Sequence, residues 1–553
     1  MATRLYHSGI LISKTEFSSN LALTATPFEQ YIFMKNSKLI PYLAIPMLVL
    51  FLTIFRGMYH IDPHHWGLML GNAKDIYDGK APYKEIFIQY GFFTTLLQAA
   101  GYAISKSLIA LVASSAMAYI LGLVILYRLA LDILKSELLA TYVVVIAFLL
   151  HPLAIFPWSN YIAFPFLVYG VATLVNENLT TRRLIIGGIS LGLATLSREG
   201  LAPAIALSIA LSLFVDIYSS QFSRKESLRR AMYLVAGFSL PLLLFFIFLA
   251  TQGLLGFWKI LAVDLPRTYA LETFSHVSGL GLFDKLIQTS IDGILNFDMR
   301  WLVIASTILV NIYFSCRFFL KNKPEYLSSA IVKISLFCLI FLTSTLHIAE
   351  IFRFSTASIV GLVSFFAVLQ FHKIATKVFI PIAVILGVTV IWGNSGLYYF
   401  PTIHDIQSGQ AVEITPYFSG QRWSPEKIQY YSSIDSELRK IDSLQSCKIE
   451  YLINNTPDSF IPLLSPFKLL QLAPFGMGES ILNLRPDIAS EQKIKIAKGE
   501  DTAITFLVPR GAATFMAHPG NYSLYTAIPA PNVVHNLENH ELAIFLPLIC
   551  FRR

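Results

Sequence analysis

Residues 39–57, LIPYLAIPMLVLFLTIFRG, form an apolar run with a single charge close to its end. A helix rises about 1.5 Å per residue, so a run of this length crosses the ~30 Å hydrocarbon core of a bilayer. Similar runs recur up to residue 394, where mixed composition begins. We therefore predict about eleven transmembrane helices, near 39–57, 108–128, 138–157, 160–178, 184–198, 201–218, 231–251, 301–320, 328–346, 351–370 and 377–394.

The composition agrees with a membrane protein. Of the 553 residues, 55% are hydrophobic and 14% are charged, whereas soluble domains contain about 25% charged residues. The net charge is +8, but the basic residues lie in short loops between apolar runs. We interpret the charge as a topology signal and expect no nucleic-acid partner. No cleavable signal peptide is visible in residues 1–37, which are predicted to be a cytoplasmic N-terminal segment.

The loop charges favour one orientation. If the N-terminus, with Lys35 and Lys38, is cytoplasmic, the short loops rich in lysine and arginine also lie inside. The longer loops 58–107 and 252–300 then lie outside, and they contain more Asp, Glu and His. Every loop agrees with this orientation under the positive-inside rule. We expect a multi-pass protein of the inner membrane, surrounded by membrane lipids, with its C-terminus in the periplasm or outside the cell.

The outside loops predict structure of their own. Two amphipathic segments, Trp66–Asp78 and Phe92–Ser105, are short for a span and are expected to lie along the membrane interface. Leu254–Val263 repeats this pattern in the second long loop, and a polar link to Asp298 follows it. Together these segments are predicted to build a roofed space at the outer face.

The C-terminal part differs from the rest of the chain. Residues 395–553 contain short apolar runs separated by Gly, Pro and Asn, which is typical of a small α/β domain. We interpret it as a support or acceptor-binding module. Cys447 and Cys550 could pair there in an oxidising compartment, although their spacing does not demand it. The predicted fold class is an all-α polytopic membrane domain, residues 38–394, followed by a small extracytoplasmic α/β domain.

The first outside loop opens with HIDPHHW, residues 60–66. Asp62 leaves the bilayer among apolar residues, which tend to raise a carboxyl pKa and favour a general base. It could equally cap a helix that begins near His64, with Pro63 in the first turn. The histidines, including His65, could bind substrate, or a divalent cation together with Asp62. Asp-x-His-His is not a standard ligand spacing, so we assign no metal ligands.

Polar residues further along this loop lie close to the membrane surface. They could hold a phosphate or sugar hydroxyls, although interface loops always contain some such residues. This set comprises Lys84, Glu85, Gln89 and Tyr90.

Three further clusters are predicted at the outer ends of spans. Arg198 and Glu199 lie between two apolar runs with almost no loop, either as a self-neutralising pair or as the lining of a water-filled cavity. Glu350 and Arg353 can share one helix face. The remaining members are His347 in the same stretch, and Asp264 and Arg267 in the second long loop. Ionisable groups at membrane depth are functional candidates, and their convergence on one surface strengthens that interpretation.

These motifs together resemble the GT-C superfamily of membrane glycosyltransferases, which includes aminoarabinose transferases and protein O-mannosyltransferases. Asp62 matches the acidic residue of the superfamily's first outside loop. Asp75–Gly79 is similar to its helix-end turn, and Gln89–Leu97 stands where many members have Lys-Pro-Pro-Leu. Gly192–Ala194, before Arg198, is similar to a Gly-Leu-Ala turn that precedes a basic residue. The resemblance covers about residues 38–394 and says little about the substrate.

Two positions depart from the family pattern. Pro63 replaces the second acidic residue of a common pair, and Gln89-Tyr90 replaces a Lys-Pro that contacts lipid phosphate in aminoarabinose transferases. If the donor is the same, phosphate binding must shift to other cations. The candidates are Lys84, Arg198, Arg267 and Arg353.

The resemblance implies a polyprenyl-phosphate sugar as donor and a glycan, lipid or protein as acceptor. We hypothesise that Asp62 removes a proton from the acceptor hydroxyl, which attacks the anomeric carbon with inversion. Arg198, Arg267 and Arg353 would stabilise the phosphate leaving group. No cofactor is certain, and a divalent cation is left open.

Three other functions fit parts of the sequence. An O-antigen polymerase or ligase typically places its key residues in a large late loop, whereas here the richest loop comes first. A transporter or flippase of lipid-linked glycans commonly shows internal repeats and broken spans at the midplane, and neither is evident. A membrane assembly protein without catalytic activity is the third alternative.

Overall fold

The computed structural model describes residues 40–59, 62–151, 157–177, 179–219, 222–268, 279–320, 328–345, 351–392, 403–472, 482–515, 520–531 and 539–551. Within these residues, five helices are long and apolar enough to cross a membrane. They are Tyr42–Tyr59, Leu108–Leu134, Glu199–Tyr218, Arg224–Thr251 and Arg300–Phe319.

Shorter apolar helices complete the bundle, so the chain is a multi-pass membrane protein. Large apolar side chains remain exposed around it, such as Met232 and Leu244 on α11, as expected for surfaces that face lipid. The helices are α3 Ile45–Tyr59, α6 Leu108–Leu134, α7 Glu137–Leu150, α8 Ser159–Val175, α9 Thr181–Ser197, α10 Ala202–Tyr218, α11 Arg224–Thr251, α15 Arg300–Phe319, α16 Ser329–Thr343, α17 Ile351–Ser358, α18 Gly361–Phe371 and α19 Ala375–Trp392.

The predicted spans are confirmed in outline, with two corrections. The predicted span 351–370 is two helices, because α17 ends at Ser358 and α18 begins at Gly361. The polar link predicted before Asp298 contains α14, Gly279–Leu295. In the last turns of α14, Ile287, Ile291 and Leu295 are exposed at a spacing of four residues, which places them on one face of the helix.

The interfacial helices of the first long loop were predicted correctly. They are α4, His65–Tyr77, and α5, Phe92–Ser105. Gly79 follows α4 with φ +84°, a left-handed conformation that glycine adopts without strain and that turns the chain. Leu254–Val263 corresponds to α12, Leu255–Lys259, and the π-helical turn Ile260–Asp264.

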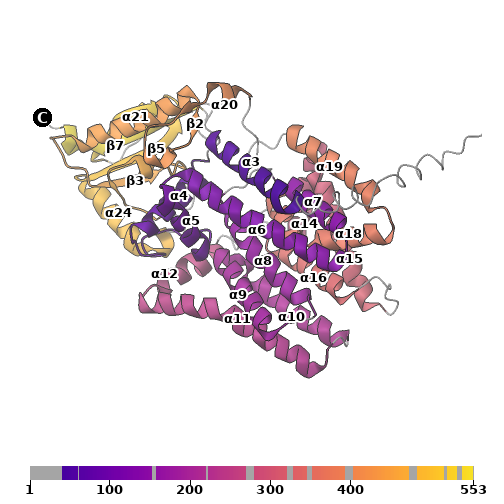
Figure 1. The fold of residues 1–553 in the computed structure, drawn as a ribbon. Coiled ribbons are helices and arrows are strands. Elements are labelled where there is room, and N and C mark those ends of the chain that lie inside the picture. The colour runs from indigo at the N-terminus through magenta and orange to yellow at the C-terminus, as the bar shows by residue number, and fades with distance from the viewer. Residues whose placement is uncertain are drawn as a thin grey trace, which may run out of the picture.

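The C-terminal part contains a five-stranded mixed sheet in the order β4-β3-β5-β7-β6. Strand β3 pairs in parallel with β4 and β5, and β7 pairs antiparallel with β5 and β6. Figure 1 shows this sheet and its helices beside α4 and α5, at one end of the bundle. The elements are β3 Tyr451–Asn455, β4 Lys468–Leu469, β5 Thr502–Pro509, β6 Tyr522–Pro529, β7 His540–Pro547, α20 Ile403–Ser408, α21 Pro425–Asp442, α22 Ile461–Leu464 and α24 Pro486–Lys498.

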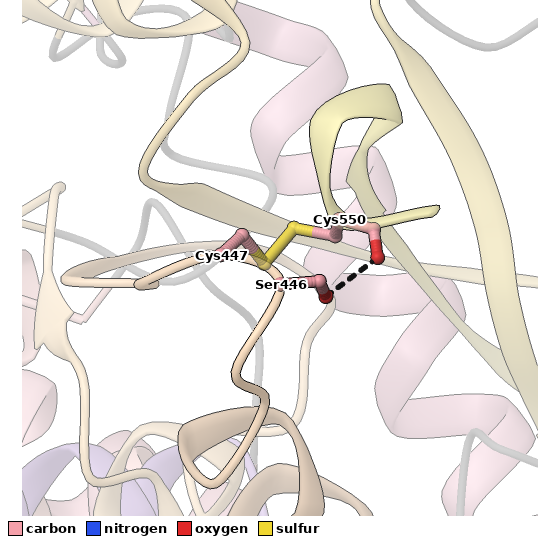
Figure 2. Close-up of a disulfide and its surroundings, with 3 residues drawn as sticks. All are labelled: Ser446, Cys447 and Cys550. Atoms are coloured by element: carbon pink, nitrogen blue, oxygen red, sulfur yellow. Dashed lines mark hydrogen bonds between the residues drawn. A yellow bond between two sulfur atoms is a disulfide. The ribbon is translucent and has the colours of Figure 1, made fainter. Parts of the chain in front are cut away.

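A disulfide closes the C-terminal part. Cys447 and Cys550 are bonded, with a Cα–Cα distance of 4.9 Å, and Ser446 Oγ donates to the Cys550 carbonyl at 2.7 Å (Figure 2). Cys447 follows α21 and Cys550 follows β7, so the bond ties the helix to the far end of the chain. Disulfides persist in oxidising compartments and are rare in the cytosol.

Replacing Cys447 and Cys550 by serine is expected to lower the free energy of unfolding of the C-terminal part by about 2–4 kcal/mol, because a loop of 103 residues regains conformational freedom. Limited proteolysis of residues 403–551 during heating measures the change. Cys316→Ser, which removes an exposed free thiol on α15, is the matched control. Equal proteolysis rates for the double variant and the control would contradict the expectation.

Candidate active site at one end of the bundle

The loop between α4 and α5, residues 80–91, covers one end of the bundle, and we call it the roof loop. Asn72 on α4 donates to the Phe87 carbonyl at 2.7 Å, which fixes the loop beneath its helix. The buried apolar side chains of the loop pack against α11 and the segment 254–265. These are Tyr83, Ile86, Phe87 and Ile88 on one side, and Phe245, Leu249, Leu254, Leu261 and Leu265 on the other.

Asp62 caps the turn that leads into α4. Its Oδ1 accepts from the backbone N–H of His64 and of His65, both at 3.0 Å. Its Oδ2 lies 2.7 Å from His65 Nδ1. The predicted capping role is therefore confirmed, and both oxygens of the carboxylate have partners.

The sequence analysis predicted a raised pKa for Asp62, and this prediction was wrong. Burial by itself raises the pKa of this carboxyl, but the hydrogen bond and charge of His65 outweigh burial, and the pKa is lowered. The sequence shows the apolar surroundings of Asp62, whereas the opposing effect depends on the side-chain position of His65. Asp62 is thus ionised at neutral pH and accepts a proton weakly.

The two histidines are held by different neighbours. The His65 ring lies among the rings of His64, Trp158 and Tyr90, with centroid distances of 4.6, 5.8 and 6.4 Å. His64 Nδ1 donates to the Pro457 carbonyl at 3.2 Å, which joins α4 to the C-terminal part. Burial lowers the pKa of His64, and the charge of His65 acts in the same direction.

The turn 456–460 of the C-terminal part packs directly on Asp62 and α4. The backbone N–H of Ser459 donates to the Pro63 carbonyl at 3.1 Å. A Cβ on Gly67 would lie 2.8 Å from the Ser459 carbonyl carbon, so only glycine permits this approach. Asp458 is buried, accepts from Tyr431 Oη at 3.0 Å and from the Phe460 N–H at 2.9 Å, and feels the negative charge of Asp62. The C-terminal part therefore forms one wall of the site.

Stability is expected to depend on the charge of Asp458. Burial raises its pKa to about 6, although the hydrogen bonds from Phe460 and Tyr431 oppose the shift. The folded state thus favours the neutral acid: the associated stability is complete below pH ~4 and is lost as pH rises through ~6, by about 3 kcal/mol. We expect Asp458→Asn to reduce the difference between thermal unfolding near pH 4.5 and pH 7.5. Asp435→Asn, which alters an ion pair on the outer face of α21, should leave it unchanged; an undiminished difference in Asp458→Asn would refute the assignment.

The roof loop meets the Ser197–Gly200 turn at its far end. Gly91 has φ +86°, and a Cβ there would lie 2.2 Å from the Ser197 carbonyl oxygen. Thr94 Oγ1 also donates to that oxygen at 2.8 Å. The sequence placed these two segments on one surface, and the structure brings them into direct contact.

Glu199 and Arg198 are not a self-neutralising pair. Tyr83 in the roof loop donates to Glu199 Oε1 at 2.8 Å, and no described residue forms an ion pair with Arg198. Instead, the guanidinium groups of Arg198 and Arg353 are close enough to repel each other. Arg198 and Glu199 are desolvated by surrounding protein, yet each keeps part of its surface accessible.

Other buried charges in the described bundle contrast with Arg198. Arg300 on α15 makes a two-point ion pair with Asp298, at 2.7 and 2.6 Å. Lys333 on α16 lies 2.6 Å from Asp216 on α10. A charge at membrane depth normally has such a partner because its desolvation is costly. Arg198, which has no such partner among the described residues, therefore indicates a site that an anion completes.

The remaining predicted residues lie in different surroundings. Lys84 and Glu85 are exposed, and Lys84 Nζ lies 6.0 Å from the Phe257 ring centroid. Gln89 Oε1 is buried and has no hydrogen-bond partner among the described residues. Asp264 pairs with Lys259 at 3.2 Å, and Arg267 is exposed, with no described contact to Arg198. His347 and Glu350 lie outside the described residues, so their predicted roles stay predictions.

The described residues do not fit a divalent cation beside Asp62. Both Asp62 oxygens are used by N–H donors, and His64 Nδ1 faces a carbonyl. Among the residues that the structure describes, no group of three or more His, Cys, Asp or Glu side chains could hold a metal ion. His60 lies outside them. No chemical step is therefore assigned to a metal.

Several residues at this end of the bundle were not identified from the sequence. They include Tyr83 in the roof loop, Trp158 beside His65 and Asp458 in the C-terminal part. His151, at the end of α7, is buried and bonds Tyr119 Oη at 2.5 Å, while the charges of Arg56 and Arg300 act on Tyr161. A lone arginine close to the end of an apolar run, as at Arg56, is the one signal that could have pointed to this cluster.

No protein family model and no curated protein matches the chain. Solved structures that match include ArnT from Cupriavidus metallidurans bound to undecaprenyl phosphate, with 11% identity over 92% of this chain and 97% of that one and a TM-score of 0.49. The apo state of the same ArnT matches with 10% identity over 92% and 98% of the two chains, at a TM-score of 0.45. The Archaeoglobus fulgidus oligosaccharyltransferase, solved with Zn and sulfate, matches with 15% identity over 84% of this chain and 67% of that one, at 0.47.

The fold class predicted from the sequence is confirmed by the chain's own elements: a helical membrane bundle, interfacial helices in the first long loop and a small sheet after the last span. The similarity concerns the fold. Any activity of this chain rests on its own residues.

Proposed function

We propose that this protein is a membrane glycosyltransferase that transfers a sugar from a polyprenyl-phosphate donor to an acceptor hydroxyl, with inversion at the anomeric carbon. One observation carries the proposal: a pair that can accept a proton, Asp62 with His65, and the Arg198 guanidinium lie beside the same end of the roof loop. His65, which is paired with Asp62, packs on Tyr90 at the end of that loop, and the next residue, Gly91, packs on the Ser197 carbonyl beside Arg198.

The two arginines suit a lipid-phosphate leaving group. As the glycosidic bond breaks, negative charge grows on the phosphate oxygen, and fixed cations in a desolvated site stabilise that charge strongly. A phosphate bound at Arg198 would supply the opposite charge that this guanidinium lacks among the described residues, and it would offset the repulsion from Arg353. The same negative charge on the phosphate that attracts the donor to the site therefore grows during the reaction.

The location suits a lipid-linked donor. The site lies where α3, α9 and α17 begin or end, so a polyprenyl chain can remain among the helices while its phosphate reaches Arg198. We place this end on the non-cytoplasmic side of the inner membrane, because the positive-inside rule favours that orientation and the Cys447–Cys550 disulfide suits an oxidising compartment. The acceptor is a glycan, a lipid or a protein that reaches the site from that side.

Release of polyprenyl phosphate tests the proposal. Purified protein in lipid nanodiscs is incubated with polyprenyl-phosphate sugars and cell-envelope extract, and the lipid products are separated. We expect donor consumption, free polyprenyl phosphate and labelled acceptor, which anomer analysis should show to be inverted. Movement of intact donor between leaflets would indicate a flippase, and a covalent glycosyl-protein would contradict a single displacement. No consumption of any donor tested would indicate an assembly protein.

A further inference from the structure

Asp62 is poorly suited to take a proton from the acceptor itself. Its Oδ1 is occupied by the backbone N–H groups of His64 and His65, and its Oδ2 by the His65 ring. The Asp62 side chain is 19% exposed, whereas that of His65 is 36% exposed. Of the two groups, the imidazole is therefore the one that an acceptor can reach.

The Asp62–His65 contact fixes the protonation pattern of the ring. An ionised carboxylate can only accept, so the 2.7 Å contact requires a proton on His65 Nδ1. In neutral imidazole the other nitrogen, Nε2, is then the acceptor. No described residue forms a hydrogen bond with that Nε2, and the ring is held in place by the aromatic neighbours His64, Trp158 and Tyr90.

We infer that His65 is the general base of the transfer and that Asp62 is its positioning partner, an inference that rests on the proposed glycosyl transfer. The acceptor hydroxyl donates its proton to His65 Nε2 while its oxygen forms the new bond to the anomeric carbon. The bond from that carbon to the phosphate oxygen breaks, and its electron pair leaves with the polyprenyl phosphate. Asp62 stabilises the imidazolium that results, which later returns its proton to water. Atoms and charge balance without a further reactant.

The surroundings of His65 support this role. Tyr90 is the neighbour of Gly91, which touches the Ser197 carbonyl next to Arg198. Two consecutive residues of the roof loop, Tyr90 and Gly91, therefore contact the proton acceptor and the backbone beside Arg198. Trp158 and Tyr90 also offer aromatic faces beside the ring, of the kind on which sugar C–H groups pack.

Chemical rescue separates this role from a structural one. In the release assay we expect His65→Ala to lower kcat by about 10²–10⁴-fold with little change in the KM for the donor, as for loss of a general base. Added imidazole should restore turnover in proportion to its concentration, because it can occupy the vacated space and accept the proton. His372→Ala, an exposed histidine at the end of α18, is the matched control and should show neither loss nor rescue.

The outcomes distinguish failure of the proposed glycosyl transfer from failure of the role inferred for His65. Wild-type protein that releases no polyprenyl phosphate overturns the proposed function and this inference with it. An active wild type with a folded His65→Ala that keeps its kcat, or that imidazole does not rescue, overturns only the inference.

A double-mutant cycle decides the question if His65→Ala does not fold. Asp62→Asn, His65→Gln and the double variant are compared in kcat, because residues that act as one unit are strongly non-additive. A double variant no slower than the slower single variant supports the pair. Losses that multiply overturn it, because they would show separate roles.

Discussion

Arg198→Met should turn over about 10²–10³-fold more slowly than wild type, the usual loss when a preorganised group that stabilises transition-state charge is removed. Methionine keeps most of the volume of the side chain and removes its charge. The same change should not destabilise the protein. Arg198 has no ion-pair partner among the described residues and is repelled by Arg353, so its removal relieves an unfavourable interaction in the absence of donor.

The Arg198 prediction is specific because activity should fall while stability does not. If Arg198 had a structural role in a buried ion pair, its replacement would lower activity and stability together, since a broken buried ion pair is strongly destabilising. We would measure kcat, the donor KM and thermal unfolding in the same lipid. Arg439→Met, which removes an exposed guanidinium on α21, is the control for charge loss as such. A clear fall in melting temperature for Arg198→Met would show that an undetected partner neutralises it and would remove the phosphate role.

Local features of this protein could be predicted from the sequence. The interfacial helix Phe92–Ser105 has the predicted bounds, and the turn at Gly79 and the cap at Asp62 are where the residue types place them. Each depends on interactions between residues close in sequence, such as a cap two or three positions away. The sequence also predicted that the roof loop and the Ser197–Gly200 turn lie on the same surface, because chain topology alone puts both at the same end of the bundle.

Partners distant in sequence could not be predicted. Glu199 is bonded to Tyr83, 116 residues earlier, rather than to its neighbour Arg198. His64 contacts the Pro457 carbonyl, 393 residues later, so the C-terminal part is a wall of the site as well as a possible support module. The pKa of Asp62 was misjudged for a related reason: burial is visible in a pattern of apolar residues, while the opposing hydrogen bond depends on one side-chain rotamer.

Asp62→Asn is the second variant expected to have a large effect, with a loss of about 10²–10⁴-fold in kcat. Asparagine is a good capping residue, and its carbonyl can accept from the His64 and His65 N–H groups as Asp62 Oδ1 does. Its amide N–H₂, however, would face His65 Nδ1 and would favour a ring proton on Nε2 instead. The ring would then present a donor to the acceptor hydroxyl, and the imidazolium would lose its counter-charge.

Comparison with Asp62→Ala isolates the electrostatic part of that loss. Alanine also removes the cap, so it should lower the free energy of unfolding by about 0.5–2 kcal/mol, while asparagine should change it little. Both variants should be similarly slow in the release assay, because both lack the carboxylate that orients His65. If Asp62→Asn kept most of the wild-type kcat while Asp62→Ala lost it together with stability, Asp62 would be a capping residue only. The proton acceptor would then have to be sought elsewhere beneath the roof loop, with Glu199 as the nearest described carboxylate to Arg198 in the sequence.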